Sequence, residues 1–362
     1  MIKIHDDDSV IVESVFKPNR KAGIKVLQDD FNRPLKDLRI SVTDRCNYRC
    51  SYCMPLDEYA WIDKQEILTF QEIVRLATLF VRLGVTKIRL TGGEPLVRKD
   101  LHELIARLSL ITGLDDLCLT TNGSLLAEQS EGLVRAGLKR VNVSIDTLDP
   151  EKFRRMTKRG NLEEVLAGLF GAKTQGLHPI KINAVVERGV NDDEIIQLAE
   201  FSRKHGFHLR FIEYMDVGNA NNWMTGKVVS KREILQKIHT HLPLEKFGSN
   251  YGNAPSVDYR YADGGGVVGV IASMSEPFCS SCTRARLTAD GKFVTCLFSS
   301  CGHDLKTFLR TGATDVEISA MISKVWSRRT DRYSDQRLEA INSGAGYRAK
   351  DFQKLEMISL GG

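Results

Sequence analysis

Long hydrophobic runs are missing from this sequence, and no apolar stretch approaches the ~20 residues of a membrane-spanning helix. The first ten residues, MIKIHDDDSV, also lack the pattern of a secretory signal. Neither sign of charge has a large excess, because 51 Lys and Arg residues are balanced by 46 Asp and Glu residues, which leaves a formal net charge of +5. So weak a charge does not indicate a nucleic-acid-binding protein, but it suits an anionic small substrate where basic residues converge. We therefore expect a cytoplasmic protein with neither a membrane segment nor a nucleic-acid partner.

Cysteine is concentrated in one short stretch. Cys46, Cys50 and Cys53 fall within CNYRCSYCMP, and no fourth cysteine lies nearby. In a reducing compartment, clustered cysteines bind metal or perform chemistry more often than they form disulfides. A structural zinc would normally have four closed ligands. Three thiolates, which are soft donors, leave one metal position open, and a 4Fe-4S cube held in this way keeps one iron free for a further ligand.

Short β-rich runs alternate with runs of helical apolar spacing over about 180 residues. The expected strands are 38–43, 86–93, 114–123, 139–146, 178–186 and 207–215, and the expected helices are 69–84, 101–113, 125–137, 161–176 and 192–206. Such alternation predicts an α/β fold with a parallel sheet and crossover helices. We expect an incomplete (β/α)6 TIM-like barrel over residues 38–215. Residues 1–37 would form an N-terminal extension, and residues 216–362 would cover the open side.

Polar and glycine-rich segments follow the expected strands. The first strand ends in Thr43-Asp44-Arg45, the second in Thr91-Gly92-Gly93-Glu94-Pro95, and the fourth in Ser144-Ile145-Asp146. Turn formation alone would explain one or two such segments, but here they follow all six strands. The carboxyl ends of parallel barrel strands carry the sites of such folds, so we expect the site at that mouth.

A second cysteine group lies in the last third of the chain. Cys279 and Cys282 are followed by Cys296, and Cys301 lies five residues further on. All four could close a structural zinc site, or the first three could hold a second cluster with an open iron. Cys118 lies inside an apolar run and is most simply a small buried hydrophobic residue.

The motifs together resemble a known family. Cys-x3-Cys-x2-Cys with Tyr52 before its third cysteine, and the Gly92-Gly93-Glu94-Pro95 segment, resemble the radical S-adenosylmethionine enzymes. The segment SEPFCSSCTRARLTADGKFVTCL extends the resemblance. Together with the first cysteine motif, it makes the chain from about Arg39 to its C-terminus resemble the GTP 3′,8-cyclase family of molybdenum cofactor biosynthesis. One departure is Ala285, where the family often has Thr between the two arginines.

The resemblance implies the reaction and the cofactors. Reductive cleavage of S-adenosylmethionine gives a 5′-deoxyadenosyl radical, which takes hydrogen from the ribose 3′ carbon of GTP, and the product is 3′,8-cyclo-7,8-dihydro-GTP. Two 4Fe-4S clusters are implied, with Cys301 a bystander. The implied metal ligands are Cys46, Cys50, Cys53, Cys279, Cys282 and Cys296.

The resemblance also implies residue roles. S-adenosylmethionine would contact Tyr52, Gly93, Ser144 and Met215. GTP would contact Arg39, Arg89, Thr120, Lys181, Arg284, Ala285 and Arg286. Catalytic roles would fall to Lys181, Arg286, Gly361 and Gly362, the last two as a tail that reaches into the site. The implied partners are GTP, an electron donor such as flavodoxin or ferredoxin, and the downstream cyclic pyranopterin monophosphate synthase, with the chain a monomer or a homodimer.

The residues themselves support a cationic lumen. Arg39, Arg89 and Lys181 lie within short apolar strands, where an unpaired charge is costly, so these side chains should face the barrel interior. Arg210 is a weaker candidate of the same kind.

Two alternatives remain open at this stage. Another radical S-adenosylmethionine enzyme with an auxiliary cluster could act on a peptide, although the cations on the strands would then be unexplained. A zinc-ribbon protein that binds nucleic acid would need a basic stripe interleaved with aromatic residues near the cysteines. Only Arg284, Arg286 and Lys292, with three phenylalanines, lie there.

Overall fold

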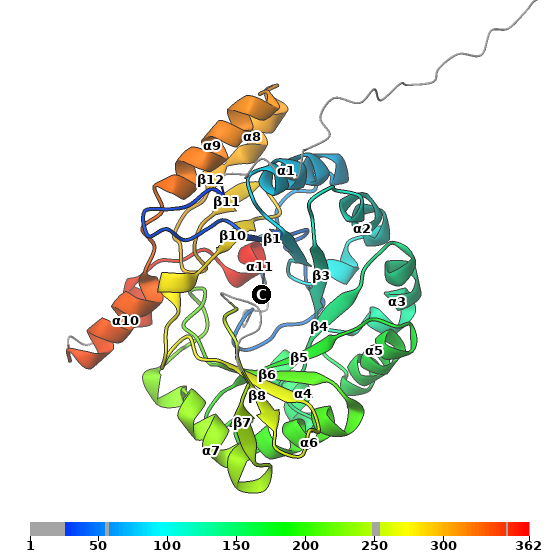
Figure 1. The fold of residues 1–362 in the computed structure, drawn as a ribbon, viewed down its shortest axis with the longest axis vertical. Coiled ribbons are helices and arrows are strands. Elements are labelled where there is room, and N and C mark those ends of the chain that lie inside the picture. Colours follow the sequence, from blue (N-terminus) through cyan, green and yellow to red (C-terminus); the bar gives the residue numbers. More distant parts are fainter. Residues whose placement is uncertain (1–25, 55–57, 248–253, 345–346, 362) are drawn as a thin grey trace, which may run out of the picture.

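A computed structural model describes residues 26–54, 58–247, 254–344 and 347–361. Six parallel strands lie side by side in chain order, as expected, and the fold is a partial TIM-like barrel (Figure 1). The strands are β1 (Asp37–Ser41), β2 (Lys87–Thr91), β3 (Asp116–Thr121), β4 (Arg140–Ser144), β5 (Ile180–Val186) and β6 (His208–Glu213). The helices between them are α1 (Phe70–Arg82), α2 (Leu101–Ser109), α3 (Leu126–Arg135), α4 (Pro150–Thr157), α5 (Leu162–Thr174) and α6 (Ile195–His205).

The sheet is wider than the six expected strands. From the C-terminal region, β10 (Arg284–Leu287) pairs in parallel with β1, and β9 (Val267–Ile271) pairs in parallel with β6. Antiparallel strands continue beyond both, and the full order is β12-β11-β10-β1-β2-β3-β4-β5-β6-β9-β8-β7. The outer strands are β7 (Leu244–Lys246), β8 (Val257–Tyr261), β11 (Lys292–Val294) and β12 (His303–Asp304). The C-terminal region therefore extends the barrel wall at both edges.

Local sequence signals explain where the barrel helices begin. Thr69 and Glu72 form a reciprocal capping box at the start of α1, and Asn161 caps α5. The helix that sequence reasoning missed is α4. Asp149 caps it and Pro150 occupies its first turn, which are usual start signals, but eight residues are too few for a clear apolar period.

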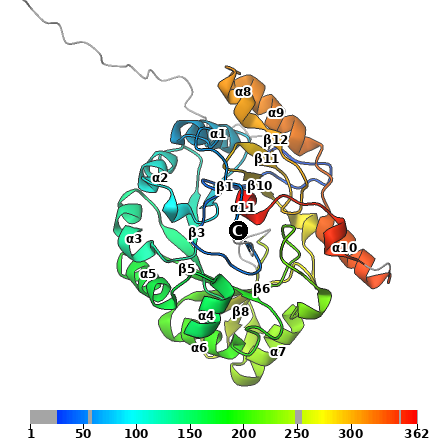
Figure 2. The same cartoon turned by 180° about the vertical axis from the view of Figure 1, so that it is seen from behind.

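The C-terminal region adds helices and returns to the barrel. Its helices are α7 (Lys231–His241), α8 (Leu305–Arg310), α9 (Asp315–Ser327), α10 (Tyr333–Asn342) and α11 (Met357–Leu360). Short 3₁₀ turns occur at Pro95–Val97, Thr225–Lys227, Cys279–Ser281 and Ala349–Asp351. Both Figure 1 and Figure 2 place the C-terminal end inside the ring of strands, with α11 beside β1 and β10.

A buried ionic network fixes this return. Asp216, just after β6, is fully buried and accepts hydrogen bonds from Arg337 of α10 and from Lys354. The hydroxyls of Tyr333 and Tyr347 donate to the same carboxylate. Burial alone would raise the pKa of Asp216, but the charges of Arg337 and Lys354 lower it. One carboxylate at the end of the sixth strand thus anchors both α10 and the segment that leads to the tail.

Part of the expected N-terminal extension packs against the second cysteine group. Asp29 and Arg33 form a buried ion pair, and Arg33 also donates to the carbonyl of Cys279. Residues 1–25 lie outside the described part of the chain. Within the described residues, no helix combines the length and the apolar character needed to cross a membrane.

Candidate active site

The first cysteine loop follows β1 and turns back on itself. The amides of Cys53 and Met54 both donate to the carbonyl of Cys50. Burial raises the pKa of the Cys46 thiol to about 11 and that of Cys53 to about 12, and it raises the pKa of Cys50 well above its usual value. The negative charges of neighbouring thiolates add to the rise at Cys50 and Cys53. Three close, buried thiols ionise readily only when a cationic group binds among them, which suits an iron–sulfur cluster.

The second cysteine group contains a sulfur that is already poised as a thiolate. Burial opposes ionisation of Cys282, but the charges of Arg284 and Arg329 outweigh it and lower its pKa to about 6. Both guanidinium groups lie against the Cys282 sulfur, at 3.5 Å and 3.4 Å. Hydrogen bonds to ligand sulfurs are among the features that tune iron–sulfur clusters.

Neither group is arranged for a single metal ion. Among the residues that the structure describes, no three His, Cys, Asp or Glu side chains are gathered closely enough to hold one ion. In a four-iron cube each cysteine binds a different iron, so three cube ligands stand further apart than the ligands of a lone zinc. Cys301 is exposed, whereas Cys279, Cys282 and Cys296 are half-buried. The soft thiolates of either group could hold an iron–sulfur cluster.

One small apolar cluster joins the two cysteine groups. Cys53 of the first group and Cys296 of the second both pack against Val217, Phe298 and Met357. Met215 also packs there and, separately, beside Tyr52. One apolar cluster therefore contacts a cysteine of each group.

Cations line one face of the strands in register. Arg286 of β10, Arg39 of β1 and Arg89 of β2 are paired across neighbouring strands, and Cys118 of β3 follows them. Two residues further along, Thr120, Asn142 and Lys181 form the next row, and Arg210 pairs with Asn183 in the row beyond. Registered residues of parallel strands share a face. Leu38 and Ile40, on the opposite face, are buried in the main hydrophobic core, so the cations face the barrel interior as expected.

Among the described residues these cations have no ion-paired partner, although Asp37 acts electrostatically on Arg39, and Asp258 acts on Lys181 and Arg210. In the part of the chain that the structure describes, Arg39, Arg89, Lys181 and Arg210 make neither an ion pair nor a hydrogen bond. Burial, followed by repulsion from neighbouring arginines, lowers the pKa of Lys181 to about 7 and that of Arg210 to about 10. The same causes lower the pKa of Arg286 to about 9 and that of Arg39 well below its usual value. Unpaired charges in a partly desolvated interior are expensive, and an anionic ligand would lower that cost.

The loops at the strand ends hold buried carboxylates that sequence reasoning missed. The Tyr52 hydroxyl donates to Asp146 over 2.6 Å, and the amide of Val185 donates to the same carboxylate. Burial raises the pKa of Asp146 to about 6 and that of Glu94 to about 7. Asp146 and Glu94 follow β4 and β2 directly, so their positions after strands were the available signal. They tie the cysteine loop to the neighbouring strands.

The glycines after β2 are explained first by packing between loops. A Cβ at Gly93 would lie 2.4 Å from the carbonyl oxygen of Arg45, and one at Gly92 would lie 2.5 Å from that of Thr43. The amide of Gly93 donates to the Thr43 carbonyl. Ser144 lies at the end of β4, on the same face as Asn142. Gly93 therefore brings the first two strand loops together at the place where the resemblance put a cofactor contact.

The tail reaches the cation row. The guanidinium of Arg286 donates to the carbonyl of Gly361 over 2.6 Å and to that of Leu360 over 3.1 Å. Gly361 has φ +70 and lies so close to Thr91 that a Cβ would fall 2.3 Å from its Cγ2. Gly362 lies outside the described residues. Ala285, between Arg284 and Arg286, is buried in the hydrophobic core on the other face of β10, so its side chain does not line the cation row.

Comparison with known proteins gives the family. Residues 40–202 match the family described as "Radical SAM superfamily", and residues 207–335 match "Molybdenum Cofactor Synthesis C". A GTP 3′,8-cyclase of Acidothermus cellulolyticus is 49% identical over 320 residues, which cover 86% of this chain and 88% of that protein. The chain belongs to the GTP 3′,8-cyclase family. A family member from Xanthomonas axonopodis pv. citri is 46% identical over 93% of this chain and 99% of its own length.

Two solved structures have a fold similar to that of this GTP 3′,8-cyclase family member. Streptococcus suis SuiB bound to the precursor peptide SuiA has a TM-score of 0.59 at 15% identity, covering 85% of this chain and 68% of that one. SuiB bound to S-adenosylmethionine has a TM-score of 0.56 at 15% identity, over 90% of this chain and 78% of that one. At this identity the likeness concerns the fold alone.

Proposed function

We propose that this protein converts GTP to 3′,8-cyclo-7,8-dihydro-GTP, the first step of molybdenum cofactor biosynthesis. Membership of the GTP 3′,8-cyclase family supports the reaction. The observation that carries the substrate is the row of buried and half-buried cations that form no ion pair with a described residue. A nucleoside triphosphate brings about four negative charges, which would offset this charge in a desolvated interior. A peptide substrate would leave it uncompensated.

Two iron–sulfur clusters are part of the proposal. Cys46, Cys50 and Cys53 would hold the first cluster together with S-adenosylmethionine, and Cys279, Cys282 and Cys296 would hold the second. When bound, the first cluster and S-adenosylmethionine supply reductive cleavage of the sulfonium, which generates the hydrogen-abstracting 5′-deoxyadenosyl group. Packing of Cys53 and Cys296 against one apolar cluster supports a site in which both cofactors face the same substrate.

The chain's own residues bind and orient the substrate. Arg39, Arg89 and Arg210 present guanidinium groups to phosphate oxygens, and Lys181 adds a compact charge one row further along. Arg286 is the member of this cation row on β10, and its charge also interacts with Cys282 and Cys296 of the second cysteine group. Lys181 and Arg286 are buried and the other three cations are half-buried, and this limited access of water strengthens each interaction.

The tail completes the wall of the site. Arg286 holds the carbonyls of Leu360 and Gly361, so the same guanidinium that borders the second cysteine group fixes the chain end. We assign Gly361 and Gly362 a positioning role beside the ribose, with Tyr52, Ser144 and Met215 around the S-adenosylmethionine. A one-electron donor protein such as flavodoxin or ferredoxin is the partner that this chemistry requires.

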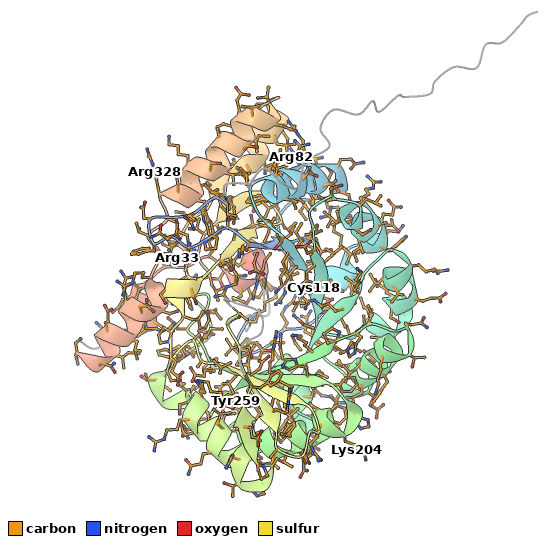
Figure 3. All side chains as sticks on the ribbon, viewed as in Figure 1. Arg33, Arg82, Cys118, Lys204, Tyr259 and Arg328 are labelled. Atoms are coloured by element: carbon orange, nitrogen blue, oxygen red, sulfur yellow. The ribbon has the colours of Figure 1, made fainter. Side chains whose placement is uncertain are left out.

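Cyclisation assays of three variants test the assignment. Lys181→Ala and Arg286→Ala should each reduce cyclised product at least ~100-fold, because each removes a buried charge aimed at the substrate. Lys204→Ala is the matched control, since Lys204 is exposed on α6 (Figure 3). Iron content and the spectrum of the first cluster should match wild type in all three. Full activity of both buried variants would reject the assignment.

Metal analysis of anaerobically purified protein tests the second cluster. Wild type should hold about eight irons and no zinc, Cys296→Ser about four irons, and Cys301→Ser about eight. Four irons with one zinc in wild type, or zinc loss in Cys301→Ser, would instead indicate a four-cysteine zinc site.

A further inference from the structure

The first cysteine loop is bonded directly to a surface helix. The amide of Arg49 donates to the carbonyl of Thr157, and the amide of Ser51 donates to that of Met156, each over 2.9 Å. Met156 and Thr157 are the last residues of α4, which faces the viewer in Figure 2. Cys50 lies between the two bonded amides. The end of α4 is therefore hydrogen-bonded to the residues on both sides of a predicted cluster ligand.

That exposed side is strongly basic. Arg154, Arg155, Lys158 and Arg159 are all exposed and fall within six positions, without an acidic residue among them. Arg154, Arg155 and Arg159 make no ion pair with any residue that the structure describes. Cations in the last helical turn interact favourably with the helix dipole, but Lys158 and Arg159 lie beyond the last turn. We call these four residues the α4 basic face. Its nearest acidic neighbours along the chain are Glu151, Glu163 and Glu164.

A cavity of about 400 Å³ opens beside this face and reaches the cysteine loop. Ser51, Arg155 and Met156 line it, together with Lys152, Glu187 and Lys227. Lys227 is paired with Glu187, and Lys152 is paired with Asp193 and Glu194, so that Arg155 is the cavity cation without an ion pair to any residue in the described part of the chain. The surface at this point is concave, carries the unpaired charge of Arg155 and includes Ser51 of the first cysteine loop.

We propose that the α4 basic face and this cavity form the docking surface for an acidic one-electron donor protein. The proposal rests on the function proposed above, because only a reducible cluster at Cys46, Cys50 and Cys53 needs such a donor. One electron passes from a reduced flavin or iron–sulfur centre of the donor to the oxidised first cluster. The donor is oxidised by one electron, the cluster is reduced by one, and no bond or proton is exchanged in this step.

Charge and position together select this partner. Complementary charge steers association and fixes orientation between proteins, and electron transfer requires a short path, which α4 offers through its bonds to residues 49 and 51. A nucleic acid would be recognised by aromatic side chains interleaved with the cations, and no aromatic residue of α4 is exposed, since Phe153 is buried.

Reductase-dependent assays test the proposal. The triple variant Arg154→Glu/Arg155→Glu/Arg159→Glu is compared with Arg82→Glu/Arg232→Glu/Arg328→Glu, which carries the same change in charge at exposed arginines of α1, α7 and the end of α9. Figure 3 labels Arg82 and Arg328. Formation of 5′-deoxyadenosine is measured with reduced flavodoxin, an acidic donor, and with dithionite, a small reductant that needs no docking surface.

The α4 variant should lose at least ~10-fold of its rate with limiting flavodoxin and keep its rate with dithionite within about twofold. The control variant should keep both rates much closer to wild type, and the wild-type rate with flavodoxin should fall with added salt. Equal flavodoxin-driven rates in the two triple variants would overturn the proposal, as would loss of both rates in the α4 variant. Failure of the proposed function would give a different result, because the wild-type protein reduced with dithionite would then form no cyclised GTP.

Discussion

The guanidinium of Arg329 lies 3.4 Å from the sulfur of Cys282 and also donates to the carbonyl of the same residue over 2.8 Å. Arg329 is almost fully buried and is held in turn by Asp29 and Asp331. A charged group fixed in this way stabilises Cys282 as a thiolate, which is the form that binds iron. The arrangement makes Arg329 a positioning residue for the second cysteine group.

Replacement of Arg329 should therefore weaken the second cluster. Arg329→Met removes a donor to a ligand sulfur, and loss of such partners typically costs 10- to 100-fold in metal affinity. We expect iron to fall from about eight toward about four per chain after mild chelation. Arg328→Met is the control, because Arg328 is the adjacent residue and is exposed (Figure 3). An unchanged iron content and an unchanged electron paramagnetic resonance signal of the second cluster in Arg329→Met would refute this role.

The close approach of Gly361 to Thr91 predicts that a methyl group there displaces the tail. Gly361→Ala should reduce cyclisation at least ~10-fold, because its Cβ would overlap Thr91 and its φ of +70 is unfavourable for alanine. Gly206→Ala separates the two causes, since Gly206 has the same φ of +70 with no atom within 4 Å of the added Cβ. Comparable loss of activity in both variants would mean that backbone strain, and not the contact with Thr91, is responsible.

The lowered pKa of Lys181 predicts pH-dependent GTP binding. Lys181 is charged below its pKa of about 7 and neutral above it in the free protein, and an anionic ligand prefers the charged form. Affinity for GTP should therefore fall as pH rises from 6.5 to 8.5, by at most about tenfold per pH unit for one proton. Calorimetry without S-adenosylmethionine measures this binding without turnover.

Comparison with Lys181→Met isolates this effect from the ionisation of GTP itself. The ratio of wild-type to variant affinity should be large at pH 6.5 and shrink toward pH 8.5. A ratio that stays constant across this range would show that Lys181 does not titrate there.

The carboxylate of Asp216 should be important for stability. Asp216→Asn would leave Arg337 and Lys354 buried without their counter-charge, and breaking a buried pair in this way costs about 3–5 kcal/mol. Asp315→Asn is the control, because the ion pair of Asp315 with Arg75 is half-exposed and should contribute about 1 kcal/mol or less. Denaturant unfolding of both variants measures the difference, and equal costs would argue against a special role for the buried network.

The sequence was sufficient to predict the six barrel strands and the cations that they carry toward the interior. Alternating patterns located all six strands between β1 and β6, and the cost of burying charge placed Arg39, Arg89 and Lys181 inside, where the structure has them. These signals are local, since each depends on neighbouring residues along one strand. The short helix α4 lacked a clear period of apolar residues, although its capping residues Asp149 and Pro150 are recognisable start signals.

Relationships between distant segments could not be predicted from local patterns. Nothing near Arg329 or Arg33 in the sequence indicates that they hold the Cys279 to Cys282 turn, because the partners are up to 246 positions away. The glycine after β2 was expected beside a ligand, yet its Cβ position is filled by another loop. Such roles depend on the folded arrangement of loops, which pattern and composition do not encode directly.

The pairing of β1 with β10 and of β6 with β9 has a consequence for how the chain reaches its folded state. Both outer strands of the six-stranded unit remain without a neighbour until segments from the last third of the chain arrive. Exposed strand edges recruit strands from other molecules, and pairings between distant segments form slowly. Residues 38–215 expressed alone should therefore aggregate through these two edges, and the C-terminal region acts as the barrel's own protection against self-association.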